Sequence, residues 1–256
     1  MVEPEGLHVV EHAAPDASAP TVVVVHGAMD RAASFGRVAR HLGDVTLVRY
    51  DRRGYARSAA LGVGTLDDHV ADLLAVVDGR PVTVFGHSIG GVIALVAAQR
   101  SPELVRSLLV YEAPSPWSPW WPSRSGRAVT DPAADDQIDR SPADEAEAFM
   151  RRAIGDRYWE RLPARTRADR RSEGPALLAD LASLRSGAPY DPRAIAAPTV
   201  VASGGETSGW HARAARELAV ALANGELTTV AGAGHGVHLS HPTATAALVR
   251  QALARQ

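Results

Sequence analysis

The sequence predicts an α/β domain whose largely parallel central sheet is covered by helices on both faces. Three observations lead to this fold class. Short apolar runs rich in β-branched residues recur along the chain, helical patterns separate them, and one long stretch without a strand-like run interrupts the alternation. Strands that alternate with helices are typical of parallel sheets, whose interior strands are apolar on both faces. The interruption predicts an inserted helical segment.

The predicted elements follow in chain order. Strands are expected at residues 21–25, 45–50, 82–85, 108–111, 199–202 and 225–230. Helices are expected at residues 66–77, 91–100, 208–223 and 243–254. In the first of these helices Leu66, Val70 and Leu73 share one stripe, as in a helix that packs one face on a sheet. The helix at 91–100 is apolar almost all round, so we expect it to be buried.

The interruption runs from about residue 115 to residue 190. It begins with Trp117, Trp120 and Trp121 among prolines, and helical patterns follow at 142–154 and 175–184. A disordered linker is the alternative, but its tryptophan and leucine content disfavours disorder. We therefore predict an α/β core made of residues 1–114 and 191–256, and a helical cap made of residues 115–190.

Composition excludes several kinds of site. The chain of 256 residues has a net charge of −2 and no cysteine, so a thiolate nucleophile, a thiolate metal site and a disulfide are excluded. It has no lysine either, which excludes a Schiff base. We expect no metal, no cofactor, no nucleic-acid partner and no membrane association. We expect a cytoplasmic protein, monomeric or homodimeric, that acts on a small molecule.

A serine stands at a glycine-rich junction between a predicted strand and a predicted helix. The sequence there is Gly86-His87-Ser88-Ile89-Gly90. A serine at such a junction adopts a strained backbone, which the small glycines on either side permit. The strain lifts the hydroxyl clear of the sheet, and the start of the helix stabilises developing negative charge. We predict Ser88 as a nucleophile; the alternative is a glycine-rich turn with an incidental serine.

A serine hydroxyl needs a general base to become a good nucleophile. His235 lies in a loop of small residues that follows the last predicted strand, from which an imidazole could reach across the strand ends. His238 and His241 are rivals, but both are expected to flank the final helix. We predict His235 as the base.

Acyl transfer also needs two backbone N–H groups directed at the developing oxyanion. Ile89, the residue after the nucleophile, supplies one of them. The other is expected from the turn after the strand at 21–25, with Ala28 as the donor and Met29 as the alternative. We interpret His26 as a structural residue that braces this turn.

Four segments of the chain now resemble the α/β-hydrolase superfamily, in the family's order and over nearly the whole length. They are His26-Gly27, Asp51-Arg52-Arg53-Gly54-Tyr55-Ala56-Arg57-Ser58, Gly86-His87-Ser88-Ile89-Gly90-Gly91 and Gly232-Ala233-Gly234-His235. The resemblance implies the α/β-hydrolase fold with an inserted cap, in a branch similar to bacterial esterases and cofactor-free haloperoxidases. It implies that the charges of the 51–58 loop brace one another. Ala56 departs from the pattern, because the family usually has a second glycine there.

The expected acid of the catalytic group is a second departure. Many family members have an aspartate a few residues after the strand at 199–202, but Ser208 occupies that place here. Glu206 is one candidate, two residues early. Glu112 is the better one, because some α/β hydrolases, including a group of haloalkane dehalogenases, place the acid at the end of this neighbouring strand. A buried carboxylate there also needs a partner, which could instead be Arg106 or an arginine of the cap.

These residues predict a cofactor-free serine hydrolase of a small or medium carboxylic ester, thioester or lactone. Met29, Trp117, Trp120 and Trp121 are candidate pocket residues, although the tryptophans could equally pack the cap on the core. Carbon–carbon bond hydrolysis and perhydrolysis would use the same residues and remain alternatives. A ligand-binding receptor on the same fold, with little turnover, is the alternative from another class. Haloalkane dehalogenation and epoxide hydrolysis are disfavoured, because both need a carboxylate at position 88.

Overall fold

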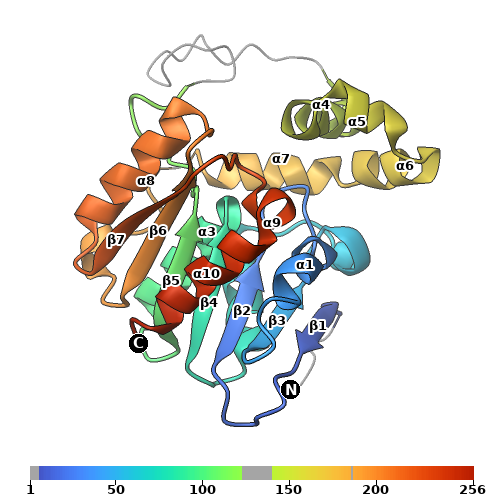
Figure 1. Cartoon of the computed structure of the whole chain (residues 1–256). Coiled ribbons are helices and arrows are strands. Elements are labelled where there is room, and N and C mark those ends of the chain that lie inside the picture. The colour runs from blue at the N-terminus through green and yellow to red at the C-terminus, as the bar shows by residue number, and fades with distance from the viewer. Residues whose placement is uncertain (1–5, 123–139, 186) are drawn as a thin grey trace.

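The computed structural model describes residues 6–122, 140–185 and 187–256. A seven-stranded sheet lies at the centre, with helices on both faces and a helical insert above its upper edge in Figure 1. The strands are β1 (Val9–His12), β2 (Thr21–Val25), β3 (Thr46–Tyr50), β4 (Val82–His87), β5 (Val105–Tyr111), β6 (Thr199–Gly204) and β7 (Gly225–Val230).

The strand order is β1-β3-β2-β4-β5-β6-β7. Only β1 is antiparallel to its neighbour, β3, and every other neighbouring pair is parallel. The predicted fold class, a mostly parallel sheet between helices, is confirmed. Because the strands are parallel, their carboxyl ends meet at one edge of the sheet, and the loops that leave β2, β4, β5 and β7 lie there together.

Alternation along β2 explains why this strand is apolar from Val22 to Val25. On β2, Val23 and Val25 belong to the core on one face of the sheet, whereas Val22 and Val24 belong to the core on the other face. Successive side chains of a strand point to opposite faces, so a strand buried on both faces has no polar position. This arrangement holds β4 and β5, which carry the candidate site, rigidly at the centre of the sheet.

The helices divide between the two faces. One face packs against α2 (Leu66–Val77), α3 (Ile89–Arg100) and α8 (Gly209–Ala221). The other packs against α1 (Gly36–Ala39), α9 (Val237–Ser240) and α10 (Pro242–Leu253), which lie in front of the sheet in Figure 1. Within the described residues, every helix is too short or too polar to cross a membrane.

The insert between β5 and β6 is helical, as predicted. It contains α4 (Pro142–Ile154), α5 (Asp156–Arg161), α6 (Ala164–Ser172) and α7 (Gly174–Ser183). Its small apolar core includes Met150, Trp159 and Leu177, and it extends to Met29 and Tyr55 below. Residues 123–139 of the predicted cap lie outside the described residues, so its boundaries at 115 and 190 remain predictions.

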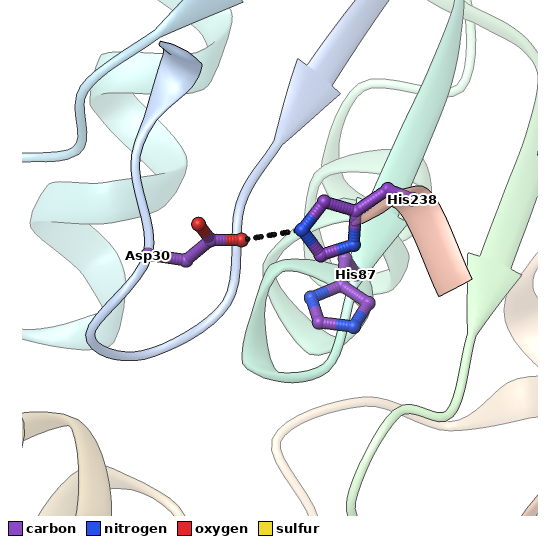
Figure 2. A group of neighbouring side chains, drawn as sticks. All are labelled: Asp30, His87 and His238. Carbon is purple, nitrogen blue, oxygen red and sulfur yellow. Dashed lines mark ion pairs between the residues drawn. The ribbon is translucent and has the colours of Figure 1, made fainter. Parts of the chain in front are cut away.

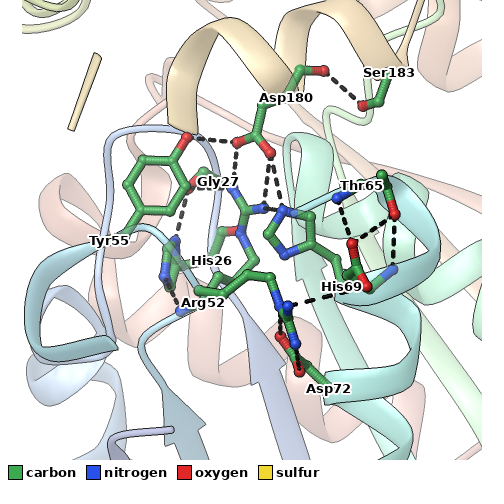
Figure 3. A network of polar contacts seen from close by, with 11 residues as sticks. His26, Gly27, Arg52, Tyr55, Thr65, His69, Asp72, Asp180 and Ser183 are labelled. Carbon is green, nitrogen blue, oxygen red and sulfur yellow. Dashed lines mark hydrogen bonds and ion pairs between the residues drawn. The ribbon is translucent and has the colours of Figure 1, made fainter. Parts of the chain in front are cut away.

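The charges of the 51–58 loop do not brace one another, contrary to what the resemblance implied. Arg52 is fully buried and forms an ion pair with Asp180 of α7, with its Nη2 2.6 Å from Oδ2. Arg53 instead pairs with Asp72 of α2. Figure 3 shows the Arg52–Asp180 pair, which Tyr55 and His69 complete by contacts with the same carboxylate. The loop therefore connects the insert to the core.

Asp180 is held as an anion by this network. Burial alone would raise the pKa of its carboxyl, but the Arg52 charge and the contacts from His69 and Arg52 hold that pKa well below its usual value. Removing one partner of a buried pair leaves the other charge without compensation.

We expect Asp180→Asn to lower the free energy of unfolding by about 3–5 kcal/mol, because it leaves the Arg52 guanidinium buried and unpaired. Urea denaturation measures the change. The matched control is Asp67→Asn, which breaks the exposed pair with Arg100 and is expected to cost less than about 1 kcal/mol. Equal losses in the two variants would contradict the anchoring role of Asp180.

Candidate active site

Ser88 occupies the turn between β4 and α3, with φ 54° and ψ −127°. Such a conformation is rare for a residue with a side chain and persists only where its surroundings enforce it. The close packing here does so: a Cβ on Gly90 would lie 2.1 Å from the Val25 oxygen, and one on Gly86 would lie 2.4 Å from the Gly90 oxygen. Ser88 also donates its backbone N–H to the Tyr111 oxygen at 2.9 Å. The turn therefore holds the Ser88 side chain at the N-terminus of α3.

His235 and Glu112 are in contact, although they lie far apart in the sequence. His235 follows β7, and its Nδ1 lies 2.6 Å from Oε2 of Glu112, which follows β5. Glu112 is completely buried, and its Oε1 accepts the Gly204 backbone N–H at 2.8 Å. A carboxylate only accepts hydrogen bonds, so His235 Nδ1 carries the proton of this bond and Nε2 is left as the basic nitrogen of the neutral ring.

The environment of Glu112 keeps it ionised. Burial alone would raise the pKa of its carboxyl, but the hydrogen bonds from His235 and Gly204 outweigh burial and lower that pKa. The backbone of Glu112 is also left-handed, with φ 49°. Glu206, the alternative acid of the sequence, has its backbone N–H bonded to the Ala233 oxygen at 2.9 Å, beside the loop that carries His235.

Two side chains hold the His235 loop through its backbone. His87 Nε2 donates to the His235 oxygen at 2.8 Å, and the Tyr111 hydroxyl donates to the Gly234 oxygen at the same distance. The His87 and His235 rings also lie 4.8 Å apart between centroids. His87 of β4 and Tyr111 of β5 therefore fix the loop of the predicted base from the strands that precede Ser88 and Glu112.

The turn after β2 lies directly beside Ser88. A Cβ on Gly27 would be 3.1 Å from the Ser88 Cβ, which places the following residue, Ala28, next to the nucleophile turn. Met29 has a left-handed backbone, with φ 57°, and its oxygen accepts a hydrogen bond from Arg170 of α6 at 3.1 Å. Both predicted donors, Ala28 and Ile89, thus belong to turns that flank Ser88.

His26 anchors this turn in its neutral form. Its Nε2 accepts the Arg52 backbone N–H at 2.9 Å, and its Nδ1 lies 2.7 Å from the Gly27 oxygen, so Nδ1 carries the only ring proton. Burial, together with the Arg52 charge, lowers the pKa of His26 to about 4. The unfolded chain binds this proton near pH 6.5 and the folded chain does not. Folding stability is therefore lost as the pH falls from about 6.5 to 4.

We expect this histidine to make the chain acid-sensitive. A shift from 6.5 to about 4 corresponds to roughly 3 kcal/mol of unfolding free energy lost between pH 7 and pH 4. His26→Gln should reduce the loss on acidification, as measured by urea denaturation at several pH values. The control, His12→Gln on the edge strand β1, should keep the pH dependence of the wild type. An unchanged pH dependence in His26→Gln would contradict the assignment.

An aromatic wall extends from His235 toward the start of the insert. The His211 ring of α8 stacks on the His235 ring at 4.7 Å, and Trp121 meets His211 edge-on at 5.2 Å. Burial lowers the pKa of His211 to about 4, so this ring is neutral at pH 7. Ser208, which stands where the family aspartate was expected, caps α8 and contacts His211 Nδ1 at 2.8 Å.

Of the other two predicted pocket tryptophans, Trp117 packs against the core and Trp120 lies against α8. Trp117 meets Tyr190 edge-on at 5.8 Å and packs on the main apolar core. Trp120 donates its indole N–H to Glu217 of α8 and lies under the Arg213 guanidinium. Of the three predicted pocket tryptophans, Trp121 is thus the one whose ring joins the wall beside His235.

Sequence reasoning missed several residues that the fold brings to this region. They include His211 on the wall and Arg170, which reaches the Met29 oxygen from the insert. The left-handed backbone of Met29 and of Glu112 was also not predicted, because neither residue is a glycine. Only the glycines around Ser88 gave a signal of this kind.

Comparisons with known proteins place this chain in a family. Residues 22–248 match the family described as the alpha/beta hydrolase family. Similar curated proteins include the uncharacterized hydrolase YraK of Bacillus subtilis, 39% identical over 37% of this chain and 38% of that protein. Lipase LipV of Mycobacterium tuberculosis is 32% identical over 36% of each chain. These matches therefore span well under half the length of either relative.

Solved structures match over nearly the whole chain. A hydrolase from Pseudomonas aeruginosa PA01 superposes with a TM-score of 0.74 and covers 98% of this chain and 97% of its own, at 20% identity. At that identity the likeness shows the fold alone, and it leaves the reaction to be inferred from the site.

Proposed function

This chain belongs to the alpha/beta hydrolase family, and we propose that it is a cofactor-free serine hydrolase of small or medium carboxylic esters, thioesters or lactones. The observation that carries the proposal is the buried carboxylate of Glu112 bonded to His235 Nδ1 at 2.6 Å, beside the strained turn of Ser88. A carboxylate, an imidazole and a strained serine at one sheet edge are the parts of a nucleophilic triad.

In the proposed reaction Ser88 Oγ attacks the substrate carbonyl carbon while His235 Nε2 takes the hydroxyl proton. The carbonyl oxygen becomes an oxyanion, and the backbone N–H groups of Ala28 and Ile89 stabilise it. When the tetrahedral intermediate collapses, His235 gives the proton to the leaving alcohol or thiol. His235 then activates water, which attacks the acyl-enzyme, releases the carboxylic acid and restores Ser88.

Glu112 has two roles in the proposed reaction. It holds the His235 ring in the tautomer with the proton on Nδ1, and its charge stabilises the imidazolium that forms when Nε2 takes the second proton. Because Glu112 is also held by the Gly204 N–H, it cannot turn away from the imidazole without losing a buried hydrogen bond. Its burial makes this charge more effective than an exposed one.

The aromatic wall beside His235 bears on the charge and size of the substrate group that fits there. Trp121, His211 and Met29 are apolar or neutral surfaces near the base and the proposed oxyanion donors. We propose that they contact an uncharged acyl or alcohol group of small or medium size. The name of the similar lipase LipV is consistent with ester chemistry.

Labelling with a fluorophosphonate tests the proposal. This probe phosphonylates activated serines, whose Oγ bonds to its phosphorus as fluoride leaves, so we expect one adduct per chain, located on Ser88 by peptide mass mapping. The labelled protein should no longer hydrolyse p-nitrophenyl acetate, butyrate or octanoate. An adduct on another residue would contradict the mechanism, and the absence of Ser88-dependent hydrolysis with esters, thioesters and lactones would favour a ligand-binding receptor.

A further inference from the structure

A second polar group lies behind the nucleophile turn, and the proposed mechanism does not use it. It consists of Asp30, from the loop after β2, His87, the last residue of β4, and His238 of α9 (Figure 2). His238 Nε2 lies 3.1 Å from Asp30 Oδ2, and the two imidazole centroids are 4.7 Å apart. One ligand atom from each of the three residues lies within 4.8 Å of the others.

These side chains are buried with unmet bonding capacity. His87 and His238 are only 5% and 2% exposed. His87 Nε2 bonds to the His235 oxygen, which can only accept, so Nε2 carries the ring proton and Nδ1 carries a free lone pair. That Nδ1, both nitrogens of His238 and Asp30 Oδ2 are buried without a well-aligned hydrogen bond in the described part of the chain. Asp30 and His238 are thus at ion-pair distance only.

Such a group is unusual, because buried polar atoms almost always have a hydrogen-bond partner and cost free energy when they do not. Three of these atoms, one from each side chain, can offer a lone pair: Asp30 Oδ2, His87 Nδ1 and the unprotonated nitrogen of a neutral His238. An electrophile placed between them would accept all three lone pairs. A proton shared by His238 and Asp30 would satisfy one pair and leave His87 Nδ1 unchanged. A metal ion would use one atom from each of the three residues.

We propose that Asp30, His87 and His238 bind one divalent transition-metal ion of the zinc class. Two imidazoles and a carboxylate are ligands that such ions prefer, whereas calcium and magnesium favour sites made wholly of oxygen. Ligands of a tetrahedral zinc lie roughly 3.3 Å apart, given bond lengths of about 2.0–2.1 Å, so small side-chain rotations close the site. The Asp30 side chain is 17% exposed and offers the route by which the ion and a fourth ligand, water, enter.

The ion would join three loops that surround Ser88. Asp30 follows Met29 in the turn of the proposed oxyanion donors, His87 precedes Ser88, and His238 follows the loop of His235. The three residues lie far apart in the sequence and come together only in the folded chain. An ion that binds all three therefore binds the folded state in preference to the unfolded state, and so stabilises it by mass action. The ion takes no part in the reaction and acts as a brace beneath the site.

Cobalt(II) is the probe, because it replaces zinc and absorbs visible light when it binds in a protein site. The full chain without a histidine tag is stripped with a chelator, freed of it and titrated with Co²⁺. We expect one ion per chain, visible absorption bands that Zn²⁺ abolishes, and a rise in Tm of about 5 °C at saturation. No saturable binding would overturn the proposal.

Matched variants locate the ion. Asp30→Asn and His238→Gln should lose the cobalt spectrum and the Tm shift. His241→Gln changes a half-buried neighbour outside this group and should keep both. His211→Gln should also keep both, because it belongs to the other group that could hold a metal, with Glu112 and His235. Loss in His211→Gln with retention in His238→Gln would place the ion in the candidate active site and overturn the proposal.

A measurement on the wild-type chain keeps the test valid if a variant fails to fold. Long-range ¹H–¹⁵N spectra report each imidazole nitrogen separately. We expect Zn²⁺ to shift the Nδ1 resonance of His87 and a ring nitrogen of His238 while the other histidines stay unchanged. Shifts confined to other histidines would show binding elsewhere and overturn the assignment.

Discussion

Ser88→Ala is expected to lower kcat/KM for p-nitrophenyl esters by at least about 10⁴-fold while the fold and its stability stay close to those of the wild type. The nucleophile and its base act as a unit, so removing the hydroxyl leaves only the contribution of the oxyanion donors and substrate binding. Alanine should adopt the φ of 54° at this position about as well as serine does, so the turn itself should persist.

Steady-state hydrolysis and circular dichroism measure the two parts of this result. The control is Ser240→Ala, which removes an exposed hydroxyl from α9. It should hydrolyse the same esters at a rate within about twofold of the wild type. Residual activity of Ser88→Ala near the wild-type level would show that another residue attacks the substrate.

Glu112→Gln is expected to lower kcat by about 10³–10⁴-fold, with a smaller change in KM. The Glu112 carboxylate accepts two hydrogen bonds, from His235 Nδ1 and from the Gly204 N–H. A glutamine has one oxygen and one NH₂ group, so it can accept from only one of the two donors. Facing its NH₂ group, His235 would take the other tautomer and lose the basic Nε2. If the NH₂ group instead faces Gly204, the buried Gly204 N–H loses the oxygen that accepts its hydrogen bond.

The same variant should lose about 1–3 kcal/mol of unfolding free energy, because hydrogen bonds to a neutral amide replace the stronger ones that the buried carboxylate accepts. Glu206→Gln is the control, and it should retain both activity and stability. Kinetics and urea denaturation are measured on both variants. A collapse of activity in Glu206→Gln with full activity in Glu112→Gln would reverse the assignment of the acid.

Much of the fold could be predicted because its signals are local. The strand at 21–25, the helix at 66–77 and the strand at 225–230 coincide with β2, α2 and β7. Each is a short segment whose apolar pattern depends only on its own residues. β1 was missed, because Val9–His12 is an edge strand with half-exposed residues and lacks the apolar run of an interior strand.

The residues of the candidate site could be predicted only where their neighbours in the sequence indicate the local structure. The glycines around Ser88 predict the strained turn, and the small residues before His235 predict a loop. The stacking of His211 on His235 and the pairing of Arg52 with Asp180 gave no local signal. Both depend on how separate elements meet in space, which a single sequence does not encode in any one segment.

The attachment of the insert bears on how this fold can be re-engineered. Arg52 pairs with Asp180 of α7, and Arg170 of α6 donates to the Met29 oxygen, so buried polar contacts join the insert to the core beside the turn that flanks Ser88. A foreign insert grafted between β5 and β6 would leave the Arg52 charge orphaned. The insert therefore cannot be exchanged by itself. A chimera with a new insert has to keep both Arg52 in the core and a partner carboxylate at the position of Asp180.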